Sequence, residues 1–177
     1  MRLYHYLIFA AVLFSSCGYA QKESTTAHTT ATDTVKNVIS DKFEVLKFMA
    51  DDKPYEASIN TRYKKFKNKI HYPLSVFINV KLSEQSKNKL SKQSDSVLFN
   101  QIEQQIIANV ASFSTCYIGN TNMNTYRDII FYIKPTNQAD FTAQLNKLKT
   151  KYPAITEFVF ENDPNWEAVS EFYSALK

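Results

Sequence analysis

The chain has 177 residues, with 21 lysines and arginines against 17 aspartates and glutamates, and a formal net charge of +4. A hydrophobic content of 44%, which includes 14% aromatic residues, is enough for the packed core of one domain and excludes global disorder. Two glycines and three histidines are too few for a glycine-rich phosphate-binding loop or for a zinc site of the usual cysteine and histidine spacing. The sequence therefore predicts no cofactor and no metal.

Residues 1–20 have the pattern of a secretory signal peptide. Arg2 supplies a positive start, and the apolar run from Leu7 to Phe14 is too short to span a bilayer. Two cleavage sites compete. Gly18-Tyr19-Ala20 fits the small residues that ordinary signal peptidase prefers, whereas Phe14-Ser15-Ser16-Cys17 resembles the lipobox of bacterial lipoproteins. In the second case Cys17 is the lipidation candidate, and its lipid would anchor the chain to a membrane.

Residues 21–40 contain six threonines, two serines and no aromatic residue, which predicts a flexible linker. A lipid-anchored domain needs such a spacer, so the linker favours an exported lipoprotein of the outer membrane or periplasm. The alternative is a soluble periplasmic or secreted protein. Either route leaves Cys116 without a disulfide partner, and its alternating strand context predicts a small buried side chain rather than a reactive thiol.

Residues 41–177 have the pattern of a single α+β domain. Alternating apolar residues predict strands at 42–50 and 55–60, which a turn at 51–54 joins into a hairpin. A basic loop or short helix follows, and the clearest alternation predicts a strand from Leu74 to Leu82. An apolar residue at every fourth position then predicts a helix over 94–110, with Ser94 as its N-cap.

The second half of the domain is expected to contain strands at 113–118, 127–133 and 155–161, a turn over 119–122 and a helix over 141–152. Asp163 and Pro164 then predict the cap and the first position of a C-terminal helix. The order from Leu74 to Glu161 is β-α-β-β-α-β. It predicts a ferredoxin-like core, an antiparallel sheet with two helices on one face, to which the N-terminal β-hairpin and the C-terminal helix are added.

Two segments resemble the signatures of a known family. They are CYIGNTNMNTYRDIIFYI at 116–133 and FVFENDPNWEAVSEFY at 158–173, and the predicted helix with Glu103 falls where that family has an acidic, leucine-rich helix. The chain therefore resembles the domain of unknown function 695 family, although Asn124 stands where a turn glycine is common. That family carries no established chemistry.

The same family is similar to the ribonuclease-regulator B group, small ferredoxin-like proteins that act by protein contact. This resemblance implies a binding module, although those regulators are cytoplasmic and the signal peptide indicates export. We therefore predict a non-enzymatic binding or interaction domain of the cell envelope. The alternative is an enzyme with an unrecognised active site. Its catalytic residues stay unknown, because His71 precedes a strand, where a lone histidine is usually structural or solvated.

Nine basic residues and one acidic residue, Glu84, lie between positions 61 and 92. Export argues against nucleic acid, so the partners that fit this segment are an anionic membrane surface, an acidic glycan or an envelope protein. The alternative is a solvated lysine face that keeps an edge strand from pairing. The candidate contact residues are Arg62, Lys64, Lys65, Lys67 and Lys69.

Aromatic residues are expected together on the strand face opposite Leu74, Val76 and Ile78. An exposed aromatic sheet can stack ligands, whereas a C-terminal helix that buries Trp166 would cover this face. We expect the helix to cover it. The aromatic residues are Phe77, Phe113, Tyr117, Tyr126 and Tyr132.

Arg127, Asp163 and Trp166 form a candidate corner that either binds a ligand or is structural. Helix capping explains Asp163 without a ligand. An ion pair between Arg127 and Asp163 would hold the corner together.

Overall fold

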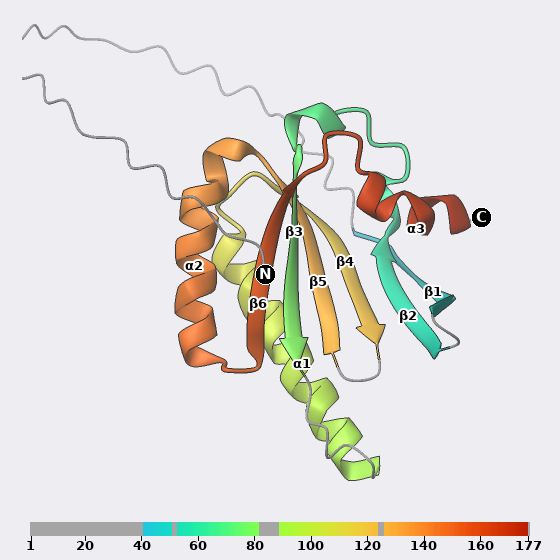
Figure 1. Cartoon of the computed structure of the whole chain (residues 1–177), viewed down its shortest axis with the longest axis vertical. Coiled ribbons are helices and arrows are strands. Elements are labelled where there is room, and N and C mark those ends of the chain that lie inside the picture. Colours follow the sequence, from blue (N-terminus) through green and yellow to red (C-terminus); the bar gives the residue numbers. More distant parts are fainter. Residues whose placement is uncertain (1–40, 51–52, 82–88, 124–125, 177) are drawn as a thin grey trace, which may run out of the picture. The chain divides into compact units, whose positions relative to one another are not determined.

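The computed structural model describes residues 41–50, 53–81, 89–123 and 126–176 (Figure 1). Within these ranges the chain forms a six-stranded antiparallel sheet and three α-helices. No helix in the same ranges combines the length and the apolarity needed to cross a membrane. The expected signal peptide, the linker and Cys17 lie outside the described residues, and so does Glu84.

The alternating segments form the strands. They are β1 (Phe43–Ala50), β2 (Lys53–Asn60), β3 (Leu74–Lys81), β4 (Thr115–Met123), β5 (Tyr126–Ile133) and β6 (Ile155–Asn162). Their order in the sheet is β1-β2-β4-β5-β3-β6, and all neighbours are antiparallel. The expected N-terminal hairpin is confirmed, because β1 pairs with β2 from Phe43 opposite Asn60 to Ala50 opposite Lys53.

One face of the sheet packs against α1 (Lys89–Val110) and α2 (Gln138–Lys151), and we call it the helical face. Val76 and Ile78 of β3 point to this face and are fully buried. Ser94 is not the N-cap of α1, since the helix begins at Lys89. Residues 89–93 include lysine, leucine and glutamine, which are strong helix formers, so the helix extends past the expected cap.

The opposite face packs against α3 (Ser170–Ala175) and the chain before it, and we call it the α3 face. Trp166 and Tyr173 lie over Ile130 and Tyr132 of β5 in one buried cluster. The expected cover by the C-terminal helix is therefore confirmed for Tyr132. It is wrong for Phe113 and Tyr117, which pack with the core of the helical face.

The two faces of β4 explain this error. Cys116 and Ile118 pack under α3, while Tyr117 packs toward α1. Both faces are apolar, so the alternation does not show which set faces the helices.

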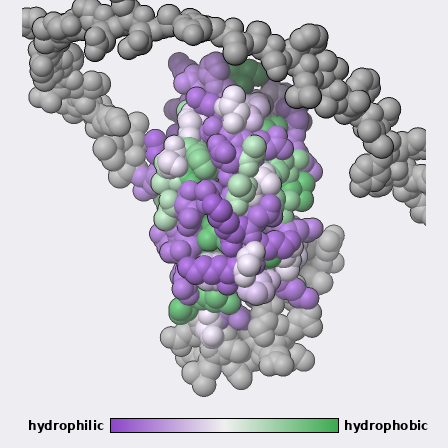
Figure 2. All heavy atoms as spheres, turned by 90° about the vertical axis from the view of Figure 1, so that its left-hand side faces the viewer, coloured by the Kyte–Doolittle hydropathy of each residue, from purple (hydrophilic) through white to green (hydrophobic). Residues whose placement is uncertain are grey.

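Figure 2 turns the side formed by α2 and β6 toward the viewer. Hydrophilic residues dominate this side, with smaller hydrophobic areas between them. β6 is the last strand of the sheet, and its Val159 is 45% exposed.

Candidate functional site

A β-bulge in β4 determines the geometry of the candidate site. The pairing of β4 with β5 shifts register between Tyr117 and Gly119, so Ile118 is an additional residue. Gly119 has a φ of 138°, and a Cβ there would lie 1.9 Å from the carbonyl oxygen of Ser58 on β2. Only glycine fits this close approach. The turn expected to start at Gly119 is therefore wrong, since β4 continues to Met123 and the glycine serves the bulge.

The bulge changes which residues of β4 face the helices. Tyr117, before the bulge, packs on the helical face. After the bulge Asn120 lies opposite the buried Ile129 and Asn122 lies opposite Arg127, so these two asparagines share that face. Residues 117 and 120 would face opposite sides of an uninterrupted strand. The bulge thus gathers three polar side chains of one strand beside α1.

Glu103 of α1 receives two of these side chains. Its Oε1 accepts hydrogen bonds from the Tyr117 hydroxyl and from Asn120 Nδ2, both at 2.6 Å. Glu103 is only 9% exposed. Burial raises the pKa of Tyr117, and the Glu103 carboxylate raises it further, so the hydroxyl stays a donor at neutral pH.

Arg127, one of the expected site residues, completes this arrangement from β5. Its Nε donates to Asn122 Oδ1 and its Nη2 to Ser96 Oγ, both at 3.1 Å. The guanidinium carbon lies 4.7 Å from the ring centroid of Phe99 on α1. Burial lowers the pKa of Arg127 and the charge of Glu103 opposes this change, yet an arginine stays protonated. We call Ser96, Glu103, Tyr117, Asn120, Asn122 and Arg127 the polar cluster.

Two atoms of the polar cluster form no hydrogen bond with a described residue. Among the described residues, no partner contacts Oε2 of Glu103 or Nη1 of Arg127. In the same part of the chain no fully buried side-chain nitrogen or oxygen lacks a partner. One is an acceptor and the other a donor, which suits a partner group that offers both, such as a peptide amide.

Asp163 and Trp166 lie on the other face of the sheet. Asp163 accepts hydrogen bonds from the backbone N–H groups of Glu167 and Ala168, at 2.8 and 3.0 Å, and from the Tyr132 hydroxyl at 2.5 Å. Burial alone would raise the pKa of Asp163, but these hydrogen bonds outweigh it and hold the pKa below the usual value. The expected ion pair with Arg127 is wrong, because the polar cluster lies on the helical face.

Trp166 is buried, as expected, with an exposed fraction of 0%. Its Nε1 donates to the carbonyl oxygen of Tyr72 at 3.0 Å. Trp166 does not lie in the expected helix with Pro164 at its first position. Trp166 has a φ of 62°, and the 3-10 helix that leads into α3 begins after it, at Glu167. Asp163 therefore caps backbone groups four and five residues ahead, as a structural corner.

A family model matches residues 41–174, which include the polar cluster and both segments that carry the resemblance noted above. The chain belongs to the family of unknown function DUF695. No curated protein and no solved structure matches it. The expected family is thus confirmed for the DUF695 domain.

The basic residues between positions 62 and 69 of the DUF695 domain have two kinds of environment. Arg62 pairs with Asp41 at 2.7 Å, and Lys64 Nζ donates to the carbonyl oxygen of Leu176. Lys69 Nζ lies 5.6 Å from the ring centroid of Trp166. Three of the five expected contact residues therefore make contacts within the domain. Lys65 and Lys67 are exposed, and neither forms an ion pair with a described residue.

A shallow depression of the DUF695 domain lies beside this segment, with a volume of about 360 Å³. His71 lies there without catalytic partners among the lining residues. The lining is Ile70, His71, Pro73, Lys134, Pro135 and Thr136. No group of three histidine, cysteine or acidic side chains that could hold a metal is present in the described ranges.

Two polar arrangements of this domain are not predicted by the sequence patterns. Glu103 was noted only as an acidic residue of a helix, although its spacing from Phe99 and Ile106 places it on the buried side of α1. The second is a row on the α3 face around Asp128, which accepts hydrogen bonds from Asn79 Nδ2 at 3.0 Å and Thr121 Oγ1 at 3.5 Å. The alternation places each residue on a face, but the strand register that joins them is not visible in one sequence.

Proposed function

We propose that this chain is an exported, non-enzymatic interaction domain of the cell envelope that binds a protein partner through β1. One observation carries the proposal. β1 is an edge strand, and Phe43, Val45 and Met49 on one of its faces are 40%, 64% and 67% exposed. We call these three residues the β1 row. Lys47 lies on the same face between Val45 and Met49 and pairs with Glu56 at 3.6 Å, so the row has one charged position. Exposed apolar side chains on the edge strand of the described sheet are typical of a surface to which another polypeptide adds.

The polar cluster lies next to the β1 row and supplies the polar part of such an interface. Val45 pairs with Ser58 of β2, and Ser58 pairs with Asn120, so the row continues across the sheet into the cluster. Phe43 also packs on Tyr117, with ring centroids 5.7 Å apart. An apolar surface bordered by polar groups is the usual composition of a protein interface.

We further infer that β3 to β6, with α1 and α2, form a ferredoxin-like core. The sheet order β4-β5-β3-β6 and the position of both helices on one face support this assignment. The β1–β2 hairpin then extends the sheet beyond β4, which leaves β1 as an edge among the described strands. A core of this kind agrees with the resemblance to ferredoxin-like regulators that act by protein contact.

Two exposed positions on opposite edges of the sheet test the β1 interface. A photo-crosslinking amino acid at Val45 is expected to trap one envelope protein in living cells, and the same amino acid at Val159 of β6 is not. Val45→Glu is expected to abolish capture of that protein, whereas Val159→Glu keeps it. Both side chains are exposed, so neither change should alter the fold. Equal crosslinking from both positions, or capture that survives Val45→Glu, would show that β1 is not the binding surface.

Export and anchoring are tested separately. We propose that Cys17 is lipidated, on the basis of the sequence Ser15-Ser16-Cys17 and the linker that follows it. A clickable fatty-acid analogue is expected to label the wild type and not Cys17→Ala, which should leave the membrane fraction. Persistent label, or persistent membrane association, in Cys17→Ala would favour cleavage after Ala20 instead.

A further inference from the structure

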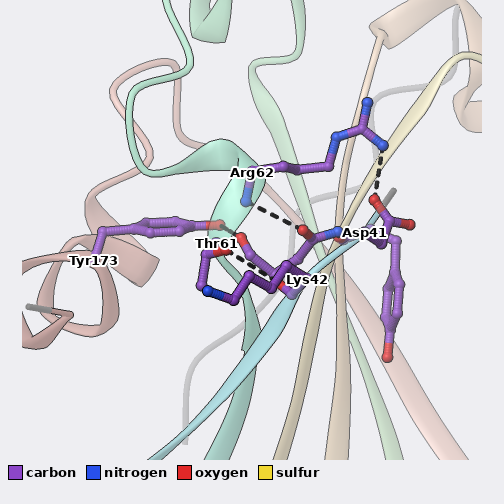
Figure 3. A network of polar contacts seen from close by, with 7 residues as sticks. Asp41, Lys42, Thr61, Arg62 and Tyr173 are labelled. Atoms are coloured by element: carbon purple, nitrogen blue, oxygen red, sulfur yellow. Dashed lines mark hydrogen bonds and ion pairs between the residues drawn. The ribbon is translucent and has the colours of Figure 1, made fainter. Parts of the chain in front are cut away.

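The structure fixes the point at which the chain enters the domain. Asp41 Oδ1 pairs with the Arg62 guanidinium at 2.7 Å (Figure 3). The carbonyl oxygen of Lys42 accepts both the backbone N–H of Thr61, at 2.8 Å, and its hydroxyl, at 3.1 Å. The first residues of the domain are therefore held against the start of the basic segment.

The same end of the sheet carries cations from two parts of the sequence. Antiparallel register places Asn60, at the end of β2, with the start of β1, and Ile133, at the end of β5, with the start of β3. Lys134 follows β5 directly, and its Nζ lies 5.5 Å from the ring centroid of Tyr72. Figure 1 shows the connection from β2 to β3 at this end of the strands, and the end of α2 at the other. We call residues 61–73 and Lys134 the basic end.

We propose that the basic end lies against the anionic phospholipid surface of the membrane that holds the chain, an inference that rests on the exported, lipid-anchored state proposed above. Chain entry and the cations share one end of the domain, so an anchor on the preceding residues brings these cations toward its own membrane. The partner is the phosphate headgroup layer, because residues 61–73 contain no acidic residue, Lys65 and Lys67 are exposed there, and Lys134 lines the open depression beside them.

The length of the linker and the range of charge attraction suit a cooperative effect between the anchor and the basic end. A flexible chain as long as residues 18–40, which include the predicted linker at 21–40, would have a root-mean-square span of about 25 Å, whereas exposed charges act over about 8 Å at physiological ionic strength. Without attraction the domain would rarely touch the surface. With the anchor in place the local concentration of headgroups is high, so a weak attraction is enough to keep the basic end in contact.

The experiment supplies its own tether, so its result does not depend on natural lipidation. The chain carries a hexahistidine tag in place of residues 1–20 and binds a nickel-chelating lipid in vesicles of phosphatidylcholine, with or without phosphatidylglycerol. A donor dye is placed at Asn68→Cys in the basic end or at Thr150→Cys near the end of α2, both exposed positions. Cys116 stays unlabelled, because it is buried and burial raises the pKa of its thiol to about 12. Headgroup-labelled lipid is the acceptor.

In anionic vesicles we expect stronger energy transfer from position 68 than from position 150. The difference should disappear in neutral vesicles and at high salt. The double variant Lys65→Gln with Lys67→Gln should lower the affinity of the domain for the anionic surface roughly fivefold for each lysine removed. The control pair Lys147→Gln with Lys151→Gln, on α2, should leave it unchanged.

Transfer from position 68 that is equal in neutral and anionic vesicles would overturn the proposal, and would assign the lysines to an acidic protein or to solvent. Equal loss in the control pair would overturn it as well. If the chain is not lipidated, the fatty-acid label at Cys17 will be absent. The vesicle result does not depend on that label, because the hexahistidine tag supplies the tether.

Discussion

Trp166 stacks on Tyr132 with ring centroids 4.2 Å apart and an interplanar angle of 20°. The Tyr132 hydroxyl donates to Asp163, whose other bonds hold the turn that carries Trp166. The tryptophan is therefore held both by its ring and by its backbone, and it joins the chain before α3 to the centre of the sheet.

Trp166→Ala is expected to lower the free energy of unfolding by about 3–5 kcal/mol, the usual cost of truncating a buried large aromatic residue. Urea denaturation followed by circular dichroism measures the change. Trp166→Phe is the control, since it keeps a ring against Tyr132 and loses the hydrogen bond to Tyr72, so it should cost less. Because Trp166 is the only tryptophan, its emission in the folded wild type should be blue-shifted. Water-like emission would contradict the burial.

Gly119→Ala is expected to destabilise the domain strongly. The backbone conformation of Gly119 costs an alanine about 1–3 kcal/mol. The contact with the Ser58 carbonyl then adds an overpacking cost of about 1–3 kcal/mol. The urea midpoint of Gly119→Ala should fall accordingly, while Thr115→Ala, at the start of the same strand, should shift it little. An unchanged midpoint for Gly119→Ala would mean that the bulge is not rigid.

Glu103→Ala and Glu103→Gln are expected to differ in stability. Alanine leaves the Tyr117 hydroxyl and the Asn120 amide without their acceptor, at a cost of about 1–3 kcal/mol. Glutamine keeps an oxygen at the same place, so it should recover most of this loss. Denaturation monitored by Trp166 fluorescence compares the two variants. Equal losses would show that the carboxylate charge, rather than its oxygen, supports the cluster.

Asp128→Asn is expected to stabilise the domain at neutral pH. Burial raises the pKa of Asp128 above its ordinary value of 3.8, so the ionised form is disfavoured in the folded state. The wild type therefore loses stability as the pH rises from the unfolded pKa through the folded one. The melting temperature of Asp128→Asn should exceed that of the wild type at pH 7, and the difference should vanish below about pH 4.

Asp163→Asn is expected to change the stability at pH 7 in the opposite direction, measured in the same pH series. The pKa of Asp163 is lowered in the fold, so its ionised form contributes stability above the unfolded pKa that is lost as the pH falls through the folded one. This variant should be less stable than the wild type at pH 7 and should approach it in acid. Parallel pH profiles for the two variants would contradict both assignments.

The sequence predicted the strands better than their contacts. Alternation located all six described strands, because each has at least one face that packs on a core. It assigned Gly119 to a turn, since glycine followed by asparagine is a turn signal, and a bulge uses the same residues. The register shift that follows from the bulge then hid the grouping of Tyr117 with Asn120.

The candidate sites show the same division between local and long-range information. Asp163 caps backbone groups within five residues of itself, so its capping role is predicted correctly from the local sequence. The partner of Arg127 was predicted wrongly, because its face is set by strand register rather than by neighbours in the chain. The αL conformation of Trp166 has no sequence signal either, since a bulky residue rarely adopts it.

The entry of the chain at β1 also sets how the domain responds to mechanical load. A force on the residues before Asp41, directed away from the sheet edge, first meets the Asp41–Arg62 pair and the Lys42–Thr61 hydrogen bonds. Once these break, the β1–β2 ladder is loaded one hydrogen bond at a time from Phe43 onward, because among the described strands β1 pairs only with β2. The hairpin strand can thus peel away while β2 stays paired with β4. An edge strand at the point of attachment would then act as an extensible segment that unpairs before the core of the domain unfolds.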